Sequence, residues 1–144
     1  MVIDVNKLAR QGKESEDICF NFPVKEELII SPEMKIESGE FKGEILLQDK
    51  VYVQGIITLK VSGACSRCLE DAIQLVEIDV EEVFSQRPQE DEYRYKSGLV
   101  DLTDMINDKI LSNQPSVLLC DINCKGLCPK CGCNLNKETC NCEK

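Results

Sequence analysis

The crowding of cysteines at the C-terminus constrains this chain more than any other feature. Five of the ten cysteines fall in the stretch GLCPKCGCNLNKETCNC, from Gly126 to Cys142. A chain of 144 residues can bury enough apolar surface to fold without cross-links, so folding alone does not explain so many thiols. The stretch itself is too short and polar to build a core. We therefore predict that metal–thiolate bonds supply its folding energy.

The N-terminal sequence bears on the redox state of these thiols. MVIDVNKLARQGKESED has no long apolar run after its basic residues, which predicts no signal peptide. No apolar stretch approaches the ~20 residues that a membrane span needs. We therefore expect a cytoplasmic protein without a membrane partner, and cytoplasmic thiols stay reduced. Clustered cysteines in that compartment indicate metal binding first, with disulfides as the alternative.

Eight of the ten cysteines form pairs at spacings typical of metal ligands: Cys65/Cys68, Cys120/Cys124, Cys128/Cys131 and Cys140/Cys142. A C-x-x-C turn lets both sulfurs bend back onto one ion, while backbone N–H groups inside the turn hydrogen-bond the thiolates. Eight thiolates complete two tetrahedral four-sulfur sites, so we predict two zinc ions. A rubredoxin-like iron site is the alternative, because it uses the same four thiolates.

Loop length suggests which pairs share an ion. Closing a short loop costs the least entropy, which favours one site made of Cys128, Cys131, Cys140 and Cys142. Gly132 would suit the tight reversal after the second knuckle cysteine. The remaining pairs, Cys65/Cys68 and Cys120/Cys124, would then clip distant parts of the chain together. Two alternatives stay open: the two C-x-x-C pairs share one ion, or Cys133 replaces Cys131.

Apolar residues that alternate with polar ones predict strands around residues 18–22, 41–47, 51–61 and 76–81. Cys65–Cys68 would lie at the tip between the last two. Cys19 is expected to point away from Phe20 as a half-buried thiol, and Gly55 to mark a bulge or a close approach.

Beyond these strands, residues 85–98 lose periodicity and predict a mobile loop, with an edge strand at Tyr93–Lys96. Asp101 would cap a helix that ends at Gln114–Pro115, and its apolar stripe is Leu102, Met105, Ile106 and Ile110. These elements predict an α+β fold: a mainly antiparallel β-sheet or partly open barrel with one or two helices and a C-terminal Cys-rich, zinc-ribbon-like module. We divide it into a β-rich domain, 1–114, and a metal-binding tail, 115–144.

The charge balance disfavours bare nucleic acid as a partner. The chain has 17 Lys and Arg against 26 Asp and Glu, a net charge of −9. Each zinc ion held by four thiolates adds two negative charges, which brings the total to about −13. Phosphate backbones attract the opposite sign. Arg67, Lys125 and Lys130 beside the cysteines are candidate RNA or partner contacts, but a basic protein is the better match.

Enzymatic chemistry finds little support in the sequence. The chain has no histidine, which excludes Ser–His and Cys–His nucleophile pairs and a histidine general base. Paired thiolates indicate closed, structural metal sites without an open position for water. The acidic series Glu77, Asp79, Glu81 and Glu82 is typical of a solvated sheet face. We therefore predict a protein that is not an enzyme.

Two stretches, GACSRCLED from Gly63 to Asp71 and CDINCKGLCPKCGCNLNKETCNC from Cys120 to Cys142, resemble the YceD family. Its members are named large ribosomal RNA subunit accumulation proteins. The resemblance implies a bacterial cytosolic protein that is needed for normal levels of 23S ribosomal RNA. It implies no catalytic residues, and Cys19 and Cys133 depart from the family pattern.

These lines combine into one hypothesis about function. We expect a non-enzymatic zinc-binding factor in large ribosomal subunit biogenesis, which supports 23S rRNA accumulation by binding a basic ribosomal protein or a precursor particle. The alternatives are a thiol-based redox or metal-responsive protein that releases zinc on oxidation, and a structural zinc-ribbon partner in another complex.

Overall fold

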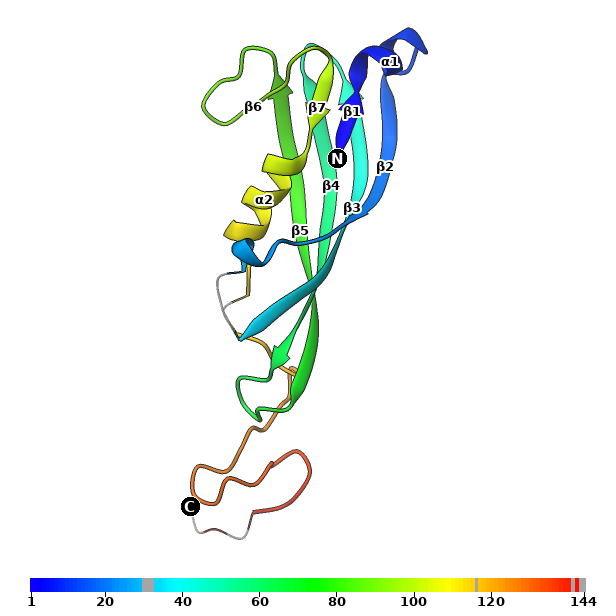
Figure 1. Cartoon of the computed structure of the whole chain (residues 1–144). Coiled ribbons are helices and arrows are strands. Elements are labelled where there is room, and N and C mark those ends of the chain that lie inside the picture. The colour runs from blue at the N-terminus through cyan, green and yellow to red at the C-terminus, as the bar shows by residue number, and fades with distance from the viewer. Residues whose placement is uncertain (30–32, 116, 141, 143–144) are drawn as a thin grey trace.

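An open, mostly antiparallel sheet forms the body of the protein (Figure 1). The computed structural model describes residues 1–29, 33–115, 117–140 and 142. The sheet has the order β2-β3-β4-β5-β6, in which β2 to β5 are antiparallel neighbours and β6 is parallel to β5. This confirms the predicted fold class in its open-sheet form. The strands are β2 (Ser15–Phe22), β3 (Met34–Leu47), β4 (Val51–Ala64), β5 (Asp71–Ser85) and β6 (Tyr93–Arg94).

A second, two-stranded sheet and short helices complete the body. β1 (Val2–Asp4) pairs antiparallel with β7 (Leu99–Asp101). Helix α1 (Val5–Arg10) follows β1, and a 3-10 turn, η1 (Glu26–Leu28), follows β2. Helix α2 (Thr103–Ser112) follows β7 and contacts η1.

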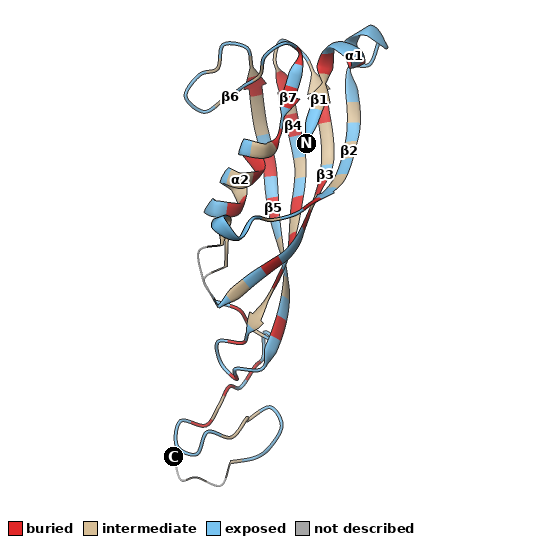
Figure 2. Ribbon diagram, in the orientation of Figure 1, coloured by how far each residue is buried: buried red, intermediate tan, exposed pale blue. Residues whose placement is uncertain are grey.

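The core lies on one face of the sheet, where the predicted alternation holds. The buried residues of β4 alternate with exposed or half-buried ones, in the banding that Figure 2 shows: Val51, Val53, Ile57, Leu59 and Val61 are buried, and Gly55 between them is half-buried. On β3 the register places the buried Ile45, Phe41 and Ile36 opposite Val53, Ile57 and Val61, and on β5 it places the buried Phe84 and Ile78 opposite Val51 and Ile57. Helix α2 contributes the predicted apolar stripe, Leu102, Met105, Ile106 and Ile110, to the same core. Burial of this stripe explains why the helix forms where it does.

Gly55 marks a close approach between strands, one of the two predicted possibilities. It pairs with Gly43 of β3, and a Cβ atom at Gly55 would lie 2.6 Å from the Gly43 Cα atom. Only glycine leaves room for the backbones at this pair. The one register shift between β3 and β4 lies elsewhere, between Ile36 and Ser38.

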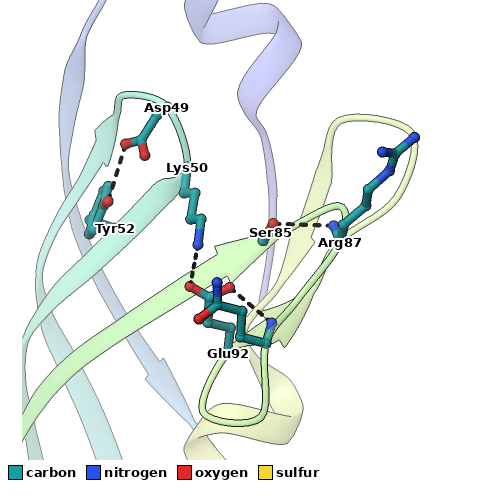
Figure 3. A network of polar contacts seen from close by, with 7 residues as sticks. Asp49, Lys50, Tyr52, Ser85, Arg87 and Glu92 are labelled. Atoms are coloured by element: carbon teal, nitrogen blue, oxygen red, sulfur yellow. Dashed lines mark hydrogen bonds and ion pairs between the residues drawn. The ribbon is translucent and has the colours of Figure 1, made fainter.

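The loop after β5, where we predicted a mobile segment, is held to the β3–β4 turn at the same end of the sheet. The Lys50 ammonium lies 2.7 Å from the Glu92 carboxylate, which also accepts the Gln89 N–H (Figure 3). The ring of Tyr93 stacks on Phe84 at a centroid distance of 5.2 Å. The predicted edge strand is confirmed as β6. The Lys50–Glu92 pair joins residues 42 positions apart, and local sequence periodicity does not report such pairing.

Two local predictions are wrong in part. Asp101 accepts hydrogen bonds from the backbone N–H and the hydroxyl of Thr103, at 2.9 and 2.6 Å, but it is not the cap that we predicted, because Leu102 holds the N-cap position of α2 without a side-chain hydrogen bond. Cys19 points to the face opposite Phe20, but it is exposed and not half-buried. The reason is that α1 and α2 bury their side chains on the other face, with Phe20 and Phe22.

The chain after α2 runs past the tip where β4 ends and β5 begins, and folds beyond it (Figure 1). Within the described residues this tail contains no helix or strand, only an isolated bridge between Leu127 and Asn134. Residues 116, 141, 143 and 144 of the predicted tail lie outside the described residues. Neither helix in the described part of the chain has the length and apolarity of a membrane span.

Candidate metal centres

Four cysteines from distant parts of the chain meet at the tip of the sheet. We call Cys65, Cys68, Cys120 and Cys124 the proximal centre. Their sulfur atoms all lie within 4.8 Å of one another. The Sγ–Sγ distance is 3.7 Å between Cys65 and Cys124 and 3.6 Å between Cys68 and Cys120. The β4–β5 tip and the chain after α2 each contribute one pair, as loop length had favoured.

The tip is shaped by backbone hydrogen bonds before any ion is considered. The Cys65 N–H donates to the Glu70 carbonyl at 2.8 Å, and the Leu69 N–H donates to the Cys65 carbonyl at 3.0 Å. Leu69 takes a positive φ of 64° to close this turn. Ser66 then fixes the chain beyond α2, because its N–H donates to the Leu118 carbonyl and its hydroxyl accepts the Leu118 N–H.

Arg67 connects the tip to the tail. Its guanidinium donates to the Cys124 carbonyl at 3.0 Å, and its own carbonyl accepts the Leu127 N–H at 3.2 Å. Both contacts are to backbone, so they position the proximal centre and the start of the tail. Arg67 was predicted as a partner contact, and the structure gives it this positioning role; Lys125 and Lys130 are exposed.

The remaining four paired cysteines form a second group, which we call the distal centre: Cys128, Cys131, Cys140 and Cys142. All four sulfur atoms again lie within 4.8 Å of one another. Cys140 Sγ lies 3.2 Å from Cys128 Sγ and 3.5 Å from Cys131 Sγ. The whole centre lies inside the tail.

The knuckle of the distal centre has the predicted geometry. Gly132 has a φ of +77°, a conformation that favours glycine, and its N–H donates to the Cys128 carbonyl at 2.9 Å. The Lys130 N–H points at the Cys128 sulfur, 3.4 Å away, and the Cys142 N–H points at the Cys140 sulfur, 3.3 Å away. Backbone donors of this kind stabilise thiolates.

The thiols of each centre cannot all ionise without a cation. The Cys68 N–H, foremost, lowers the pKa of Cys65 to about 6, and the Cys131 N–H does the same for Cys128. The neighbouring Cys68 thiol raises the pKa of Cys120 to about 12, and Cys140 raises that of Cys142 to about 12. Four clustered thiolates repel one another, so a divalent ion is the charge that would let all of them lose their protons.

The sulfur positions fit a tetrahedral ion. Zinc–sulfur bonds of about 2.3 Å in tetrahedral geometry place neighbouring sulfurs about 3.8 Å apart. The observed pairs lie at 3.2 to 3.7 Å, slightly closer than that. The other sulfur pairs of each group lie within 4.8 Å, so small side-chain displacements separate the two geometries. Both groups are therefore compatible with one metal ion each.

Asn136 connects the two centres, a role that its sequence position did not reveal. Its side-chain N–H group lies 3.3 Å from the Cys124 sulfur, and its side-chain oxygen accepts the Lys125 N–H at 2.9 Å. The residue itself belongs to the loop between Cys131 and Cys140. Asn136 therefore joins the distal loop to a sulfur of the proximal centre.

Two cysteines stand outside both groups of four. Cys133 is half-buried beside the distal centre, where Cys131, foremost, and Cys140 raise the pKa of its thiol to about 12. Its carbonyl accepts the Cys128 N–H at 2.8 Å. Cys19 lies on β2, far along the sheet from the tip (Figure 1).

The fold and the site define a class of protein: an open antiparallel sheet whose tip and tail carry two closed four-cysteine groups. The model of the family described as large ribosomal RNA subunit accumulation protein YceD matches residues 53–144, which include both groups. The match covers more than half of the chain, so this chain belongs to the YceD family.

Individual relatives agree with this assignment. Uncharacterised proteins of Mycobacterium bovis and Mycobacterium tuberculosis are each 30% identical over 100 residues, covering 64% of this chain and 48% of theirs. A chloroplastic large ribosomal RNA subunit accumulation protein YCED homolog of Arabidopsis thaliana is 42% identical over 43 residues, covering 30% of this chain and 13% of its own. The chain spans about half the length, or less, of these curated relatives. No solved structure matches significantly.

Proposed function

We propose that this protein is a non-enzymatic zinc-binding factor that supports accumulation of 23S ribosomal RNA by assisting assembly of the large ribosomal subunit. The observation that carries the proposal is the match to the YceD family over residues 53–144, the part that contains every paired cysteine. The name of the plant relative points to the same process for that protein.

The chemistry of the two centres supports zinc and a structural role. Four thiolates with no open position suit Zn²⁺ in a closed site, which contributes folding energy and does not activate water. Iron binds the same ligands and is the competing ion. Ion binding at the proximal centre would lock the β4–β5 tip to the chain after α2.

The partner is a basic protein of the large subunit, or a precursor particle that exposes one, in the cytoplasm. The net charge of −9 becomes about −13 with two zinc centres, so long-range fields would steer basic surfaces toward this protein and repel bare RNA. Among the described residues beside the centres, Arg67 is bonded to the Cys124 carbonyl and Lys137 to the Glu70 carboxylate. Lys125 and Lys130 are exposed without such a bond, and two charges are few for a phosphate surface.

Co-sedimentation from cell extracts tests the proposal. We expect the tagged protein to migrate with large-subunit precursors, and a pull-down to recover a large-subunit protein. Binding to isolated 23S RNA fragments should be weak and salt-sensitive. Binding of protein-free RNA with Kd below about 1 μM at physiological salt, abolished by neutralising Arg67, Lys125 and Lys130, would show that those residues form an RNA site instead.

A second candidate function is a thiol-based switch, and Cys133 is the observation that favours it. This fifth thiol lies against Cys131 and Cys140 of the distal centre. The Cys133 thiol, a neighbouring thiol of the distal centre and one hydrogen peroxide molecule give a disulfide and two waters. This disulfide removes one ligand from the distal centre and so weakens its hold on the ion. Metal content measured before and after peroxide treatment, with Cys133→Ser as the control, separates this function from a purely structural one.

A further inference from the structure

One long edge of the sheet has no neighbouring strand. β4 accompanies β5 from Asp71 to Phe84, whereas β6 pairs with the other side of β5 only at Phe84 and Ser85. Within the described residues, nothing else pairs with that second side. An open edge presents rows of N–H and C=O groups that can accept a further strand.

The register identifies which backbone groups face this edge. The Ser85 carbonyl accepts the Tyr95 N–H at 3.1 Å, so the backbone groups of Ser85 point toward the β6 side. The pairing of β5 with β4 runs without a shift over the whole strand, and the direction of backbone groups alternates along a strand. The odd-numbered residues from Ile73 to Glu81 therefore direct their N–H and C=O groups outward. No backbone hydrogen bond from the described part of the chain reaches them.

The side chains of the same residues form an ordered, exposed row. Ile73 and Leu75 are 60% and 65% exposed, which is unusual for two large apolar side chains in succession on one face. Glu77, Asp79 and Glu81 continue the row and are also exposed. The edge thus has an apolar part next to the β4–β5 tip and an acidic part beyond it.

The acidic part is not neutralised within the described structure. None of its three carboxylates takes part in an ion pair or hydrogen bond with the described residues. The residues of β4 that face them across the sheet, Thr58, Ile56 and Gln54, carry no charge. Lys42 and Lys109 line the same hollow as Asp79 and Glu81 but form no ion pair with them, and Lys109 pairs with Glu82 instead. The negative charge of the three carboxylates is therefore available to a partner.

We propose that this edge binds an extended basic segment of a partner protein as an added antiparallel β-strand. The segment would alternate three basic side chains and then two apolar ones along one face, opposite Glu81, Asp79, Glu77, Leu75 and Ile73. Main-chain hydrogen bonds supply affinity and the alternating side chains supply specificity. The inference rests on the proposed function in one respect, that the segment belongs to a large-subunit protein.

Charge decides against the other occupants of this edge. A second copy of the chain, paired antiparallel about Glu77, would place carboxylates opposite one another or opposite apolar side chains, and like charges in that position destabilise a sheet. RNA has no strand to add and shares the negative sign. A basic protein segment satisfies both the backbone groups and the carboxylates.

Amide exchange in the full reduced protein tests this inference directly. The probe is a synthetic peptide of about nine residues that spans the row, with Lys, Lys, Lys, Ile and Val at odd positions and Thr at even ones. At a peptide concentration about tenfold above Kd, exchange at the odd-numbered amides from 73 to 81 should slow about tenfold. The even-numbered amides between them already bond to β4 and should not change. Peptide binding without this alternation would overturn strand addition.

Two matched controls separate backbone pairing from charge attraction. The same peptide, N-methylated on the amides that would face β5, keeps its charge and loses those donors, and should bind at least about tenfold more weakly. Asp79→Ala removes one carboxylate, whereas Asp79→Pro also removes the outward N–H and leaves the β4 ladder intact. Asp79→Pro should therefore bind the peptide more weakly than Asp79→Ala. Equal binding of the two peptides would contradict the inference even if the proline variant fails to fold.

The results also distinguish this inference from the proposed function. If Asp79→Pro folds and still co-sediments with large-subunit precursors, the edge is not the docking site and the assembly role stands. If the peptide protects the edge but the protein does not co-sediment, the edge binds basic strands and the assembly role is wrong. If the peptide-free protein is a dimer and the Asp79→Pro protein is a monomer, the edge binds a second copy of the chain instead.

Discussion

The sheet and the tail of this protein use different sources of stability. In the sheet the fully buried side chains are large and apolar, such as Phe41, Ile57 and Phe84. In the described tail the buried side chains are Leu118 and two cysteines, Cys124 and Cys128. Burial of apolar area stabilises the sheet by about 25 cal/mol per Å². The tail buries too little area for that, so its order depends on what the cysteines bind.

The two centres differ in whether the sheet or the tail supplies their cysteines. The proximal centre takes one cysteine pair from the sheet and one from the tail, and backbone hydrogen bonds already shape its turn. The distal centre takes all four from the tail. Loss of an ion should therefore unfold the distal loop and only loosen the tip of the sheet, because the sheet keeps its own core.

Removal of both ions should produce the largest difference between the two regions. Structural zinc binding is worth about 10 kcal/mol or more per site, and the tail has no other comparable contribution. We expect a strong chelator to abolish amide protection across residues 120–142, while amides between β3 and β4 stay protected. Hydrogen exchange followed by mass spectrometry measures both regions at once. If the tail remains protected without metal, its order does not depend on the ions and the two regions do not differ in this respect.

Single ligand replacements should affect the two centres differently. Cys124→Ser should loosen the tip and the tail together, because the proximal centre joins residues 59 positions apart. Cys140→Ser should lower the metal content by about one ion and disorder only the distal loop, since all four distal ligands lie in the tail. Disorder around Cys65 in the Cys140→Ser protein, seen by exchange or NMR, would show that the two C-x-x-C pairs share an ion after all.

Asn136→Ala should have a smaller effect at the boundary between the regions. It removes the hydrogen-bond donor to the Cys124 sulfur and the acceptor for the Lys125 N–H. Loss of such a supporting contact costs about tenfold in metal affinity, which competition with a chromogenic chelator measures. Lys137→Ala is the matched control, because it breaks only an exposed ion pair with Glu70 and should leave the affinity unchanged.

Asp101→Asn should have the smallest effect and should be confined to the body. Hydrogen bonds from the Thr103 hydroxyl, and then from its N–H, lower the pKa of Asp101. The charged form therefore stabilises the folded state above the ordinary aspartate pKa of 3.8, and this stabilisation is lost as the pH falls through the folded-state value. We expect a loss of about 0.5 kcal/mol near neutral pH. Urea unfolding should show the difference shrinking below pH 3.8, and a constant difference would contradict this origin.

The sequence predicted those parts of the fold that depend on residues close together in the chain. Alternation along residues 51–61 identified the buried face of β4, and the apolar stripe identified α2. Loop length alone favoured the grouping of cysteines that the structure shows. These signals work because strand and helix periods, and the cost of closing a loop, depend on neighbours in the chain.

The sequence did not predict the contacts that join distant segments. Nothing local indicates that Lys50 would hold Glu92, or that Asn136 would reach the Cys124 sulfur. The predicted half-burial of Cys19 was wrong for the same reason, because the exposure of this residue depends on which face of the sheet the helices cover. The open edge of β5 likewise follows from where β6 stops, which is a property of the whole sheet.

The central claim is that two closed four-thiolate centres order the tail, and that the proximal centre holds it to the sheet. Elemental analysis of the purified reduced protein, combined with X-ray absorption at the zinc edge, tests it most directly. We predict close to two zinc ions per chain, each with four sulfur neighbours at about 2.3 Å. About one ion per chain, a nitrogen or oxygen neighbour in the first shell, or a metal-free protein with an ordered tail would contradict the account.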